Sequence, residues 1–582
     1  MNRRTIKVAV AAILAVATVA PWATSGVAGA SAAAATVTPT EPTAYLVLFK
    51  DRTSDSAMAQ FGRRYGDFTS LNTRVGLGTI VTTRGDFLTQ ARASRDVEYV
   101  GLDRIMGQVA PYSNRTHGRL QSVAEAGRAV EQLKTERDAS KGSFRPGRPG
   151  HPVTGPLGTG ANEPLASLQA DMTAMNVFDA QAIDQGSHKV RVGIIDTGVD
   201  GPHPDIAANF DNKLSRNFTV DIPAIDGECA DDPDGSCIDA NNVDEDSHGT
   251  HVAGTIGAPI NGIGMSGVAP GVDLVNLRAG QDSGYFFTQP TVNALTYAGD
   301  NGIDVVNMSF YVDPWLYNCW ANPADSPEDQ IEQRLIITAT NRALSYARRR
   351  GVTLVSALGN EATDMGNPGL DQTSPDFGAD AYDRPIDNAT CLDIPAESPG
   401  VISVSSVGPS GRKAYYSNYG TEQTDVSAPG GDYRDFPGTD QYRTPENLIL
   451  APYPAGVAAA VGDIDANGDP TTPFVLKSCK GSVCGYYQYL QGTSMAAPHA
   501  VGVAALIISK YGNRDSGGVT ADPGLVEFVL RATATRTACP TPATYVYPLL
   551  PADYTATCVG TKAYNGFYGS GVVNALSAIK RR

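Results

Sequence analysis

Short, almost purely apolar runs alternate with helical stretches through the C-terminal two thirds of the chain, and this pattern constrains the fold most. The runs cover 190–195, 274–277, 305–308, 352–357 and 401–407. Helical stretches such as 338–350 and 496–510 accompany them. Strands that are apolar on both faces need cover on both faces, as in a parallel sheet flanked by helices. We therefore predict an α/β, three-layer domain with a mainly parallel central sheet, and functional groups at the carboxyl ends of its strands.

The N-terminus has the order of a secretory signal. Arg3, Arg4 and Lys7 precede an apolar run over 8–20, and a stretch of small residues follows. A membrane anchor is the alternative, but it needs about 20 residues to span a bilayer. We therefore predict that residues 1–32 are a signal peptide, that the protein is secreted, and that it has no membrane partner.

The charge of the chain is divided unevenly. Of 45 Lys and Arg and 61 Asp and Glu, residues 1–160 hold 20 and 12, a net of +8. Residues 161–582 then hold 25 and 49, a net of −24. The overall net charge of −16 argues against a nucleic-acid partner, because phosphate binding needs clustered Lys and Arg. The opposite signs favour attraction between the two parts.

The basic part contains a small unit followed by a linker. Residues 44–106 show a β-α-β pattern, with strands expected at 45–49, 79–81 and 97–100 and a helical stretch near 57–65. This length is enough for a small α+β domain. Residues 107–160 combine a helix-like segment with a Pro/Gly-rich stretch that cannot hold a regular element. We interpret 107–160 as a helix plus an exposed linker.

Asp196 ends the first apolar run of the acidic part. A carboxylate at the end of a buried strand is largely desolvated, which is costly unless a hydrogen-bonding partner compensates. Asp196 is therefore a candidate catalytic group, with a carboxylate satisfied by turn amides as the alternative.

His248 and His251 are two of the five histidines in residues 161–582, and glycine follows His248 directly. A histidine beside glycine at a helix start allows close approach of another chain and can accept a proton near neutral pH. Zinc is an alternative, but the metalloprotease signature has its histidines four apart with a Glu beside the first. We predict that His248 is catalytic and that His251 is a buried, hydrogen-bonded core residue.

Ser494 lies in the segment Gly492-Thr493-Ser494-Met495-Ala496, at the start of a helix of small residues. The backbone amides and dipole at a helix start stabilise negative charge, and small neighbours leave room for a substrate. For a serine considered alone, a helix N-cap is the alternative role.

Taken together, Asp196, His248 and Ser494 in this chain order, each within an extended motif, resemble the catalytic triad of the subtilisin-like serine peptidases, the subtilase family or peptidase family S8. The resemblance covers about residues 166–578. It implies that Ser494 is the nucleophile, that His248 is the general base and then acid, and that Asp196 holds the imidazole. It also implies that Asn360 and the backbone N–H of Ser494 bind the oxyanion, and that catalysis needs no cofactor.

The family usually pairs the substrate backbone with edge segments of the enzyme. Two such segments here are 307–311 and 283–286. Tyr311 replaces a glycine that is usual in the family, so we expect it to crowd or cap the pocket for the side chain before the cut. Asp246 could favour a basic substrate residue, with an exposed loop acid as the alternative. The predicted substrate-binding residues are Ser309, Phe310, Tyr311, Gly284 and Gly359.

The resemblance also implies a structural calcium ion. Asp205 and Asn261 match two side-chain ligands of a calcium site in subtilisins, and carbonyls of the 259–265 loop would complete an oxygen cage.

The cysteines fit an exported protein, because their number is even and all eight lie in the acidic part. Eight cysteines allow 105 pairings, so the connectivity is formally open. Sequence proximity favours Cys229–Cys237, Cys479–Cys484 and Cys539–Cys558, which leaves Cys319–Cys391.

Residues 33–106 resemble the inhibitor-type prodomain of subtilases, which docks on the protease and blocks it until removed. We therefore expect a ferredoxin-like α+β prodomain, the linker over 107–160, and a peptidase domain over 161–582. The charges of +8 and −24 favour docking, although salt screens exposed charges over about 8–10 Å.

These features predict a secreted serine endopeptidase made as a zymogen, which hydrolyses peptide bonds through an acyl-enzyme on Ser494. The alternatives are a processing peptidase of narrow specificity and a subtilase fold that only binds. The expected partners are a peptide or protein substrate and the chain's own prodomain, and we expect a monomer.

Overall fold

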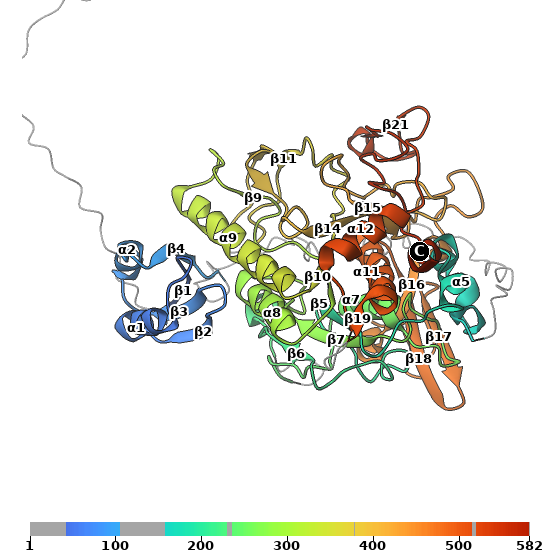
Figure 1. Cartoon of the computed structure of the whole chain (residues 1–582), viewed down its shortest axis with the longest axis horizontal. Coiled ribbons are helices and arrows are strands. Elements are labelled where there is room, and N and C mark those ends of the chain that lie inside the picture. Colours follow the sequence, from blue (N-terminus) through green and yellow to red (C-terminus); the bar gives the residue numbers. More distant parts are fainter. Residues whose placement is uncertain (1–41, 105–157, 230–234, 378, 515–518, 581–582) are drawn as a thin grey trace, which may run out of the picture.

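The computed structural model describes residues 42–104, 158–229, 235–377, 379–514 and 519–580, and a seven-stranded parallel sheet lies at its centre (Figure 1). The strand order is β15-β14-β10-β8-β5-β7-β6, and every neighbouring pair is parallel. The strands are β5 (Arg191–Ile195), β6 (Arg216–Asn217), β7 (Asp273–Arg278), β8 (Val305–Met308), β10 (Thr353–Ala357), β14 (Val401–Val407) and β15 (Val426–Pro429). The predicted sheet is confirmed, and each of the five apolar runs forms one of its strands. The short strands β6 and β15 at the two edges were not predicted.

Helices cover both faces of this sheet, each over its own hydrophobic core. One core contains residues of α4 (Ala170–Ala174), α5 (Val177–Gln181), α7 (His248–Gly257), α11 (Thr493–Tyr511), α12 (Pro523–Thr533) and α13 (Ala575–Lys580). The other contains residues of α8 (Thr288–Asp300) and α9 (Pro327–Arg349). This confirms the predicted three-layer arrangement. Helix α9 begins eleven residues before the predicted 338–350, because Ser326 caps it by accepting from the Asp329 N–H.

Smaller elements complete the main domain. A three-stranded antiparallel sheet, in the order β16-β18-β17, leads directly into α11. Its strands are β16 (Ile449–Tyr453), β17 (Val475–Lys480) and β18 (Val483–Leu490). Two-stranded pairs are formed by β9 (Asn318–Cys319) with β13 (Cys391–Leu392), β11 (Gly369–Asp371) with β12 (Arg384–Ile386), β19 (Asn513–Arg514) with β20 (Val519–Thr520), and β21 (Thr544–Tyr545) with β22 (Ala556–Thr557). The short helices are α6 (Pro223–Asp226) and α10 (Ala455–Ala460).

The N-terminal unit is an antiparallel sheet with two helices, in the strand order β2-β3-β1-β4. Its elements are β1 (Thr43–Phe49), α1 (Asp55–Tyr65), β2 (Phe68–Asn72), β3 (Leu77–Thr82), α2 (Phe87–Arg92) and β4 (Val97–Leu102). The predicted α+β arrangement is confirmed, and β2 is an addition. On β1, Tyr45, Val47 and Phe49 belong to the unit's own core, whereas Leu46 and Leu48 belong to the core beneath α8 and α9. Because successive side chains of a strand point to opposite faces, β1 contributes to both cores and joins the unit to the main domain.

Polar contacts strengthen this junction, and Figure 1 shows the unit beside α8 and α9. Arg104 forms ion pairs with Asp329 at 2.8 Å and Glu332 at 2.7 Å on α9. These pairs have the sign that the uneven net charge predicts. In the ion pair between Arg342 of α9 and Glu98 of β4, by contrast, the cation belongs to the main domain and the acid to the N-terminal unit. Net charge therefore accounts for part of the interface, and apolar packing accounts for the rest.

The predicted signal peptide 1–32 and all of the predicted segment 107–160 except 158–160 lie outside the described residues. In the part of the chain that is described, no helix has both the length and the apolar character to cross a membrane. All eight cysteines form disulfides. The pairs are those that sequence proximity favours: Cys229–Cys237, Cys319–Cys391, Cys479–Cys484 and Cys539–Cys558.

Candidate active site

The predicted site residues meet at the carboxyl edge of three neighbouring central strands. Asp196 follows β5, Ser309 follows β8, and Asn360 lies three residues after β10. His248 is the first residue of α7 and Ser494 the second of α11, two helices that pack against each other in the same core. The parallel order β10-β8-β5 therefore gathers groups that are far apart in sequence.

Asp196 and His248 form a buried hydrogen-bonded pair. His248 Nδ1 lies 2.7 Å from Asp196 Oδ1, which also accepts from the Thr197 N–H at 2.9 Å. Neither residue is more than 1% exposed. Gly249 permits the close approach, since a side chain there would begin 2.0 Å from the Gly198 carbonyl oxygen. This geometry directs Nε2 of His248 away from Asp196.

The surroundings of His248 make it a stronger base. Burial lowers the pKa of its imidazole, but the Asp196 carboxylate and the nearby Asp246 and Asp244 outweigh that effect, so the net pKa is raised. Asp246 accepts from the His248 N–H at 2.9 Å and is partly buried. The alternative of an exposed loop acid for Asp246 is therefore wrong, because this carboxylate caps the first turn of α7.

Ser494 lies at the N-terminus of α11, where the first N–H groups of a helix have no partner within the helix. Its hydroxyl donates to the Ser309 carbonyl at a long 3.4 Å rather than to His248. A long or misdirected nucleophile contact is common in the absence of substrate.

Asn360 is locked onto the nucleophile helix. Its Oδ1 accepts from the Thr493 N–H at 2.8 Å and from the Thr493 hydroxyl at 3.0 Å. The Thr493 hydroxyl also accepts from the Gly359 N–H at 3.0 Å. Because the amide is planar, these contacts present its nitrogen on the side opposite Thr493. Asn360 and the start of α11 are thus held in fixed register, as an oxyanion hole requires.

A small pocket lies beside Ser494, and the empty space of about 270 Å³ in and around it includes open solvent. It is lined by Ser309, Phe310, Tyr311, Leu316, Ala357, Gly359, Asp393, Thr493 and Ser494. Four of the five predicted substrate-binding residues are among them. Tyr311 forms part of the wall, as expected, and its hydroxyl donates to Asp376 at 2.6 Å.

Gly284 does not line this pocket. It lies in a turn with a φ of +84°, where its N–H donates to the Gln281 carbonyl at 2.8 Å. The next residue, Tyr285, is buried, stacks on Phe287 and donates its hydroxyl to the Asp376 carbonyl at 2.9 Å. The aromatics of this segment therefore fill a neighbouring core.

His251 is a core residue, as predicted. It is fully buried, its Nε2 lies 3.0 Å from the Ile449 carbonyl, and burial lowers its pKa to about 3. The imidazole of His251 is therefore neutral and contributes to the packing of the core.

The residues predicted to hold calcium do come together, but they do not fit the ion as arranged. Asn261 turns its amide N–H toward Asp205 Oδ1 at 2.9 Å, while Met265 N–H and Tyr487 hydroxyl donate to Asp205 Oδ2 at 3.0 and 2.8 Å. The Lys480 ammonium donates to the Asn261 carbonyl at 2.6 Å. Donors thus occupy both carboxylate oxygens, and a cation of the chain itself occupies a carbonyl of the loop.

Four pocket residues, Leu316, Ala357, Asp393 and Thr493, were not among the predicted site residues. Asp393 follows Cys391 and Leu392 and precedes Ile394. A carboxylate inside an apolar run beside a cysteine is the signal that could have marked it, since buried acids need a partner.

The model of the subtilase family matches residues 187–571, which is well over half of the chain. The chain therefore belongs to the subtilase family, a family of serine endopeptidases. Subtilisin DY from Bacillus licheniformis is 28% identical over 322 residues, 55% of this chain and 77% of its own length. The nisin leader peptide-processing serine protease NisP from Lactococcus lactis is 27% identical over 341 residues, 58% of this chain and 43% of its own length.

Solved structures show the same fold. The epidermin leader peptide processing serine protease EpiP from Staphylococcus aureus has a TM-score of 0.58 at 20% identity, covering 93% of this chain and 100% of its own. Fervidolysin from Fervidobacterium pennivorans, described as a keratinolytic enzyme related to subtilisin, has a TM-score of 0.51 at 19% identity, covering 93% of this chain and 61% of its own.

Proposed function

We propose that this protein cleaves peptide bonds within polypeptides through an acyl-enzyme formed on Ser494. The observation that carries the proposal is the buried Asp196–His248 pair, at the same sheet edge as Ser494 and the pocket beside it. A base held by a carboxylate, a hydroxyl at a helix start and an adjoining pocket are the parts that acyl transfer to serine needs.

Each group has a defined task in the reaction. Ser494 Oγ attacks the carbonyl carbon of the substrate, and His248 Nε2 takes the hydroxyl proton. The N–H of Ser494 and the side-chain amide of Asn360 stabilise the oxyanion. The C–N bond then breaks, and His248 gives its proton to the leaving amine. Water, activated by the same histidine, releases the acid product and restores Ser494, so no cofactor takes part.

Residues 33–106 act in this proposal as a prodomain that holds the enzyme as a zymogen, and residues 1–32 direct its secretion. The contacts of Arg104 with Asp329 and Glu332, and the burial of Leu46 and Leu48 against the main domain, support a docked unit. A calcium ion at Asp205 and Asn261 is not part of the proposal, since Lys480 and other donors occupy that loop.

A processing peptidase of narrow specificity is the second candidate. The aromatic wall at Tyr311, tied to Asp376, limits what the pocket admits. Two of the proteins that this chain is similar to are named as leader-peptide processing proteases. Rapid digestion of unrelated proteins such as casein contradicts this candidate, whereas cleavage of few peptides supports it.

The experiment compares Ser494→Ala with the wild type and with Ser410→Ala, which removes an exposed hydroxyl. We expect Ser494→Ala to lose about 10⁶ in turnover and to lose labelling by a fluorophosphonate, while Ser410→Ala keeps both. Mass spectrometry of the secreted protein identifies the labelled residue and the N-terminus together. Labelling of another residue, or unchanged turnover, refutes the proposal. An Ser494→Ala chain that retains residues 33–106, where Ser410→Ala does not, shows that the enzyme removes its own prodomain.

A further inference from the structure

We propose that the pocket beside Ser494 selects a basic side chain, arginine or lysine, at the substrate position before the cleaved bond, and that Asp393 makes this selection. The inference rests on the proposed function, because it assigns the substrate class of the same site. Four observations carry it: the place of Asp393, the lack of a partner for its carboxylate among the described residues, the charges around it, and the apolar residues that line the same pocket.

Asp393 lines the same pocket as the nucleophile. Residues 309–311, Ala357, Gly359, Thr493 and Ser494 line it together with Asp393. The disulfide Cys319–Cys391 and the pairing of β9 with β13 hold the segment that carries Asp393. A substrate bound with its reactive carbonyl at Ser494 therefore directs the preceding side chain toward Asp393.

The carboxylate of Asp393 has no partner among the residues that the structure describes. The residue is 4% exposed. Its backbone N–H donates to Glu397 Oε2 at 2.8 Å, and its carbonyl accepts from the Glu397 N–H at 2.8 Å. No hydrogen bond or ion pair to its carboxylate oxygens comes from residues in the described parts of the chain. A buried acid in this state is costly unless a ligand completes it.

The charged groups that act on Asp393 are themselves acids. Burial raises its pKa well above the usual range, and the nearby Glu397 and Glu361 raise it further. The same acids surround the buried hydroxyl of Tyr317. Three carboxyl groups thus share one region, and a cation entering the pocket favours the ionised form of Asp393.

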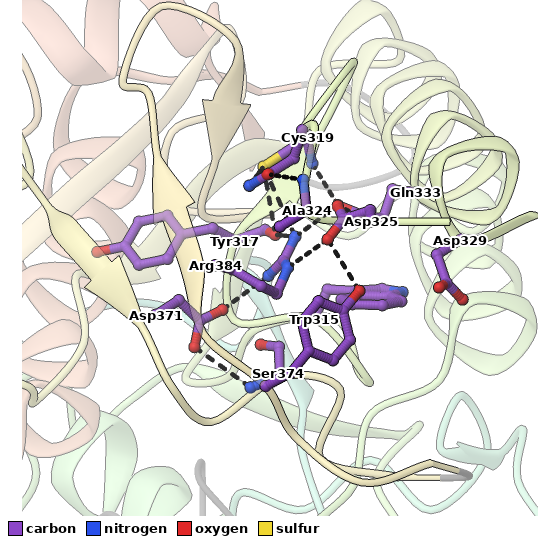
Figure 2. Close-up of polar contacts among 12 residues, drawn as sticks. Trp315, Tyr317, Cys319, Ala324, Asp325, Asp329, Gln333, Asp371, Ser374 and Arg384 are labelled. Carbon is purple, nitrogen blue, oxygen red and sulfur yellow. Dashed lines mark hydrogen bonds and ion pairs between the residues drawn. The ribbon is translucent and has the colours of Figure 1, made fainter. Parts of the chain in front are cut away.

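Arg384, a buried arginine whose guanidinium contacts the Tyr317 carbonyl, forms ion pairs with acids other than Asp393 (Figure 2). Arg384 directs Nε to Asp325 at 2.8 Å and Nη1 to Asp371 at 2.7 Å. Its Nη2 donates to the Tyr317 carbonyl at 3.1 Å, and also to Asp325 and Gln333. Every nitrogen of this guanidinium has a partner, so Arg384 does not neutralise Asp393.

The pocket suits the stem of a long basic side chain. Phe310, Tyr311 and Leu316 provide apolar surface in the lining of the same pocket as the acid. Lysine and arginine bury their methylene stems along such surface while the charged head reaches a polar group. A wholly apolar substrate side chain contacts the same apolar residues but gives Asp393 no partner.

The test uses peptides that differ only in the residue before the cleaved bond: Arg, Lys, Gln, Leu, Phe and Glu. We compare kcat/KM for the wild type, Asp393→Asn, Asp393→Glu and the control Asp440→Asn, which removes an exposed acid. The wild type and the control are expected to prefer Arg and Lys over Gln and Leu by about 10²-fold or more. Asp393→Asn loses that preference by reducing the Arg and Lys rates alone, and Asp393→Glu restores part of it.

A second measurement does not depend on the variant's folding. Peptide aldehydes ending in arginine or leucine compete with a fluorophosphonate for Ser494 in the wild-type enzyme. Stronger protection by the arginine aldehyde supports the proposal, and equal or weaker protection overturns it.

The failures are distinguishable. An enzyme that labels at Ser494 but cleaves after Leu, Phe or Gln as fast as after Arg overturns the inference and leaves the proposed function intact. Retained preference for Arg in Asp393→Asn also overturns it, because selection then lies elsewhere. Absence of both labelling and peptide cleavage overturns the proposed function itself.

Discussion

Two buried acidic clusters meet at Tyr317, and they differ in one respect. In the first, Asp325 and Asp371 form ion pairs with Arg384. The guanidinium of Arg384 also lies over the Trp315 ring, 4.6 Å from the ring centroid. In the second, Asp393 lines the pocket beside Ser494, and the nearby Glu397 and Glu361 raise its pKa. Among the described residues, no arginine forms an ion pair with any of these three acids. The acids of the first cluster are paired with an arginine of the chain itself, whereas Asp393 of the second lines the pocket that we propose for the substrate.

The difference indicates what each cluster is for. A buried acid with an arginine from its own chain is a structural element, because the pair is satisfied whether or not a ligand is present. Buried acids without one store unfavourable free energy that a cationic ligand relieves on binding. We therefore expect the Arg384 cluster to stabilise the fold, and the open cluster around Asp393 to select the substrate.

The largest expected effect comes from breaking the completed cluster. Arg384→Gln leaves Asp325 and Asp371 buried without their cation, so we expect the free energy of unfolding to fall by about 3–5 kcal/mol. Arg350→Gln is the control, since its ion pair with Asp300 is exposed and removing it costs within about 1 kcal/mol. Denaturant unfolding is measured in Ser494→Ala chains to avoid self-digestion. Equal losses in the two variants contradict the structural role of Arg384.

The second prediction concerns the pH dependence of the open cluster. Burial raises the pKa of Glu397 to about 7 and that of Asp393 well above its usual range. With raised pKa values in the folded state, these acids hold more protons than in the unfolded chain. Their contribution to stability is therefore fully present at acid pH and is lost as the pH rises through the folded pKa values.

A cation in the pocket favours the ionised acids, so its binding releases protons. The affinity for an arginine aldehyde, relative to a leucine aldehyde, is expected to increase from pH 5 to pH 8, by up to about tenfold per pH unit for each proton released. The ratio cancels the titration of His248, which affects both aldehydes. Asp393→Asn flattens the ratio. A ratio that is independent of pH in the wild type contradicts coupling between cation binding and the ionisation of Asp393.

The smallest expected effect tests a third acidic region that the chain completes by itself. Lys480 donates to the loop carbonyl of Asn261, beside Asp205 and Glu163. We expect a calcium chelator to leave the thermal midpoint unchanged, and Lys480→Met to cost less than about 1 kcal/mol because the ammonium is exposed. Lys477→Met, which removes an exposed pair with Asp469, is the control. A large loss of stability on chelation shows instead that a metal holds this loop.

The fold was predictable because its determinants are local. Each of the five apolar runs carries its own requirement for burial on both faces, and the helical stretches between them cover those faces. The edge strand β6 has two residues and β15 four, too few for a periodic pattern to mark them. The early start of α9 was missed because its first turns follow a cap at Ser326 rather than an apolar period.

The residues of the candidate site that lie in short sequence motifs could be predicted, because each motif can be recognised without knowing the fold. His248, Ser494 and Asn360 each lie in a segment of a few residues with its own signature, and the sheet edge that gathers them follows from parallel topology. The calcium expectation did not anticipate Lys480, which is 219 positions away from Asn261 in the sequence. Gly284 was assigned to substrate binding from its position in a motif, but the turn that contains it lies outside the pocket lining.

The sequence by itself determined the parallel sheet, the candidate catalytic groups and the favoured disulfide pairs, because hydrophobic period, local motif and chain proximity are properties of neighbouring residues. Only the tertiary structure decided which buried charges are satisfied. Whether Asp205, Asp371 or Asp393 has a partner depends on side chains brought from distant segments, by Lys480 and Tyr487 in one case and Arg384 in another. Electrostatic interactions act through space and fall with distance, so their balance is set by the folded arrangement.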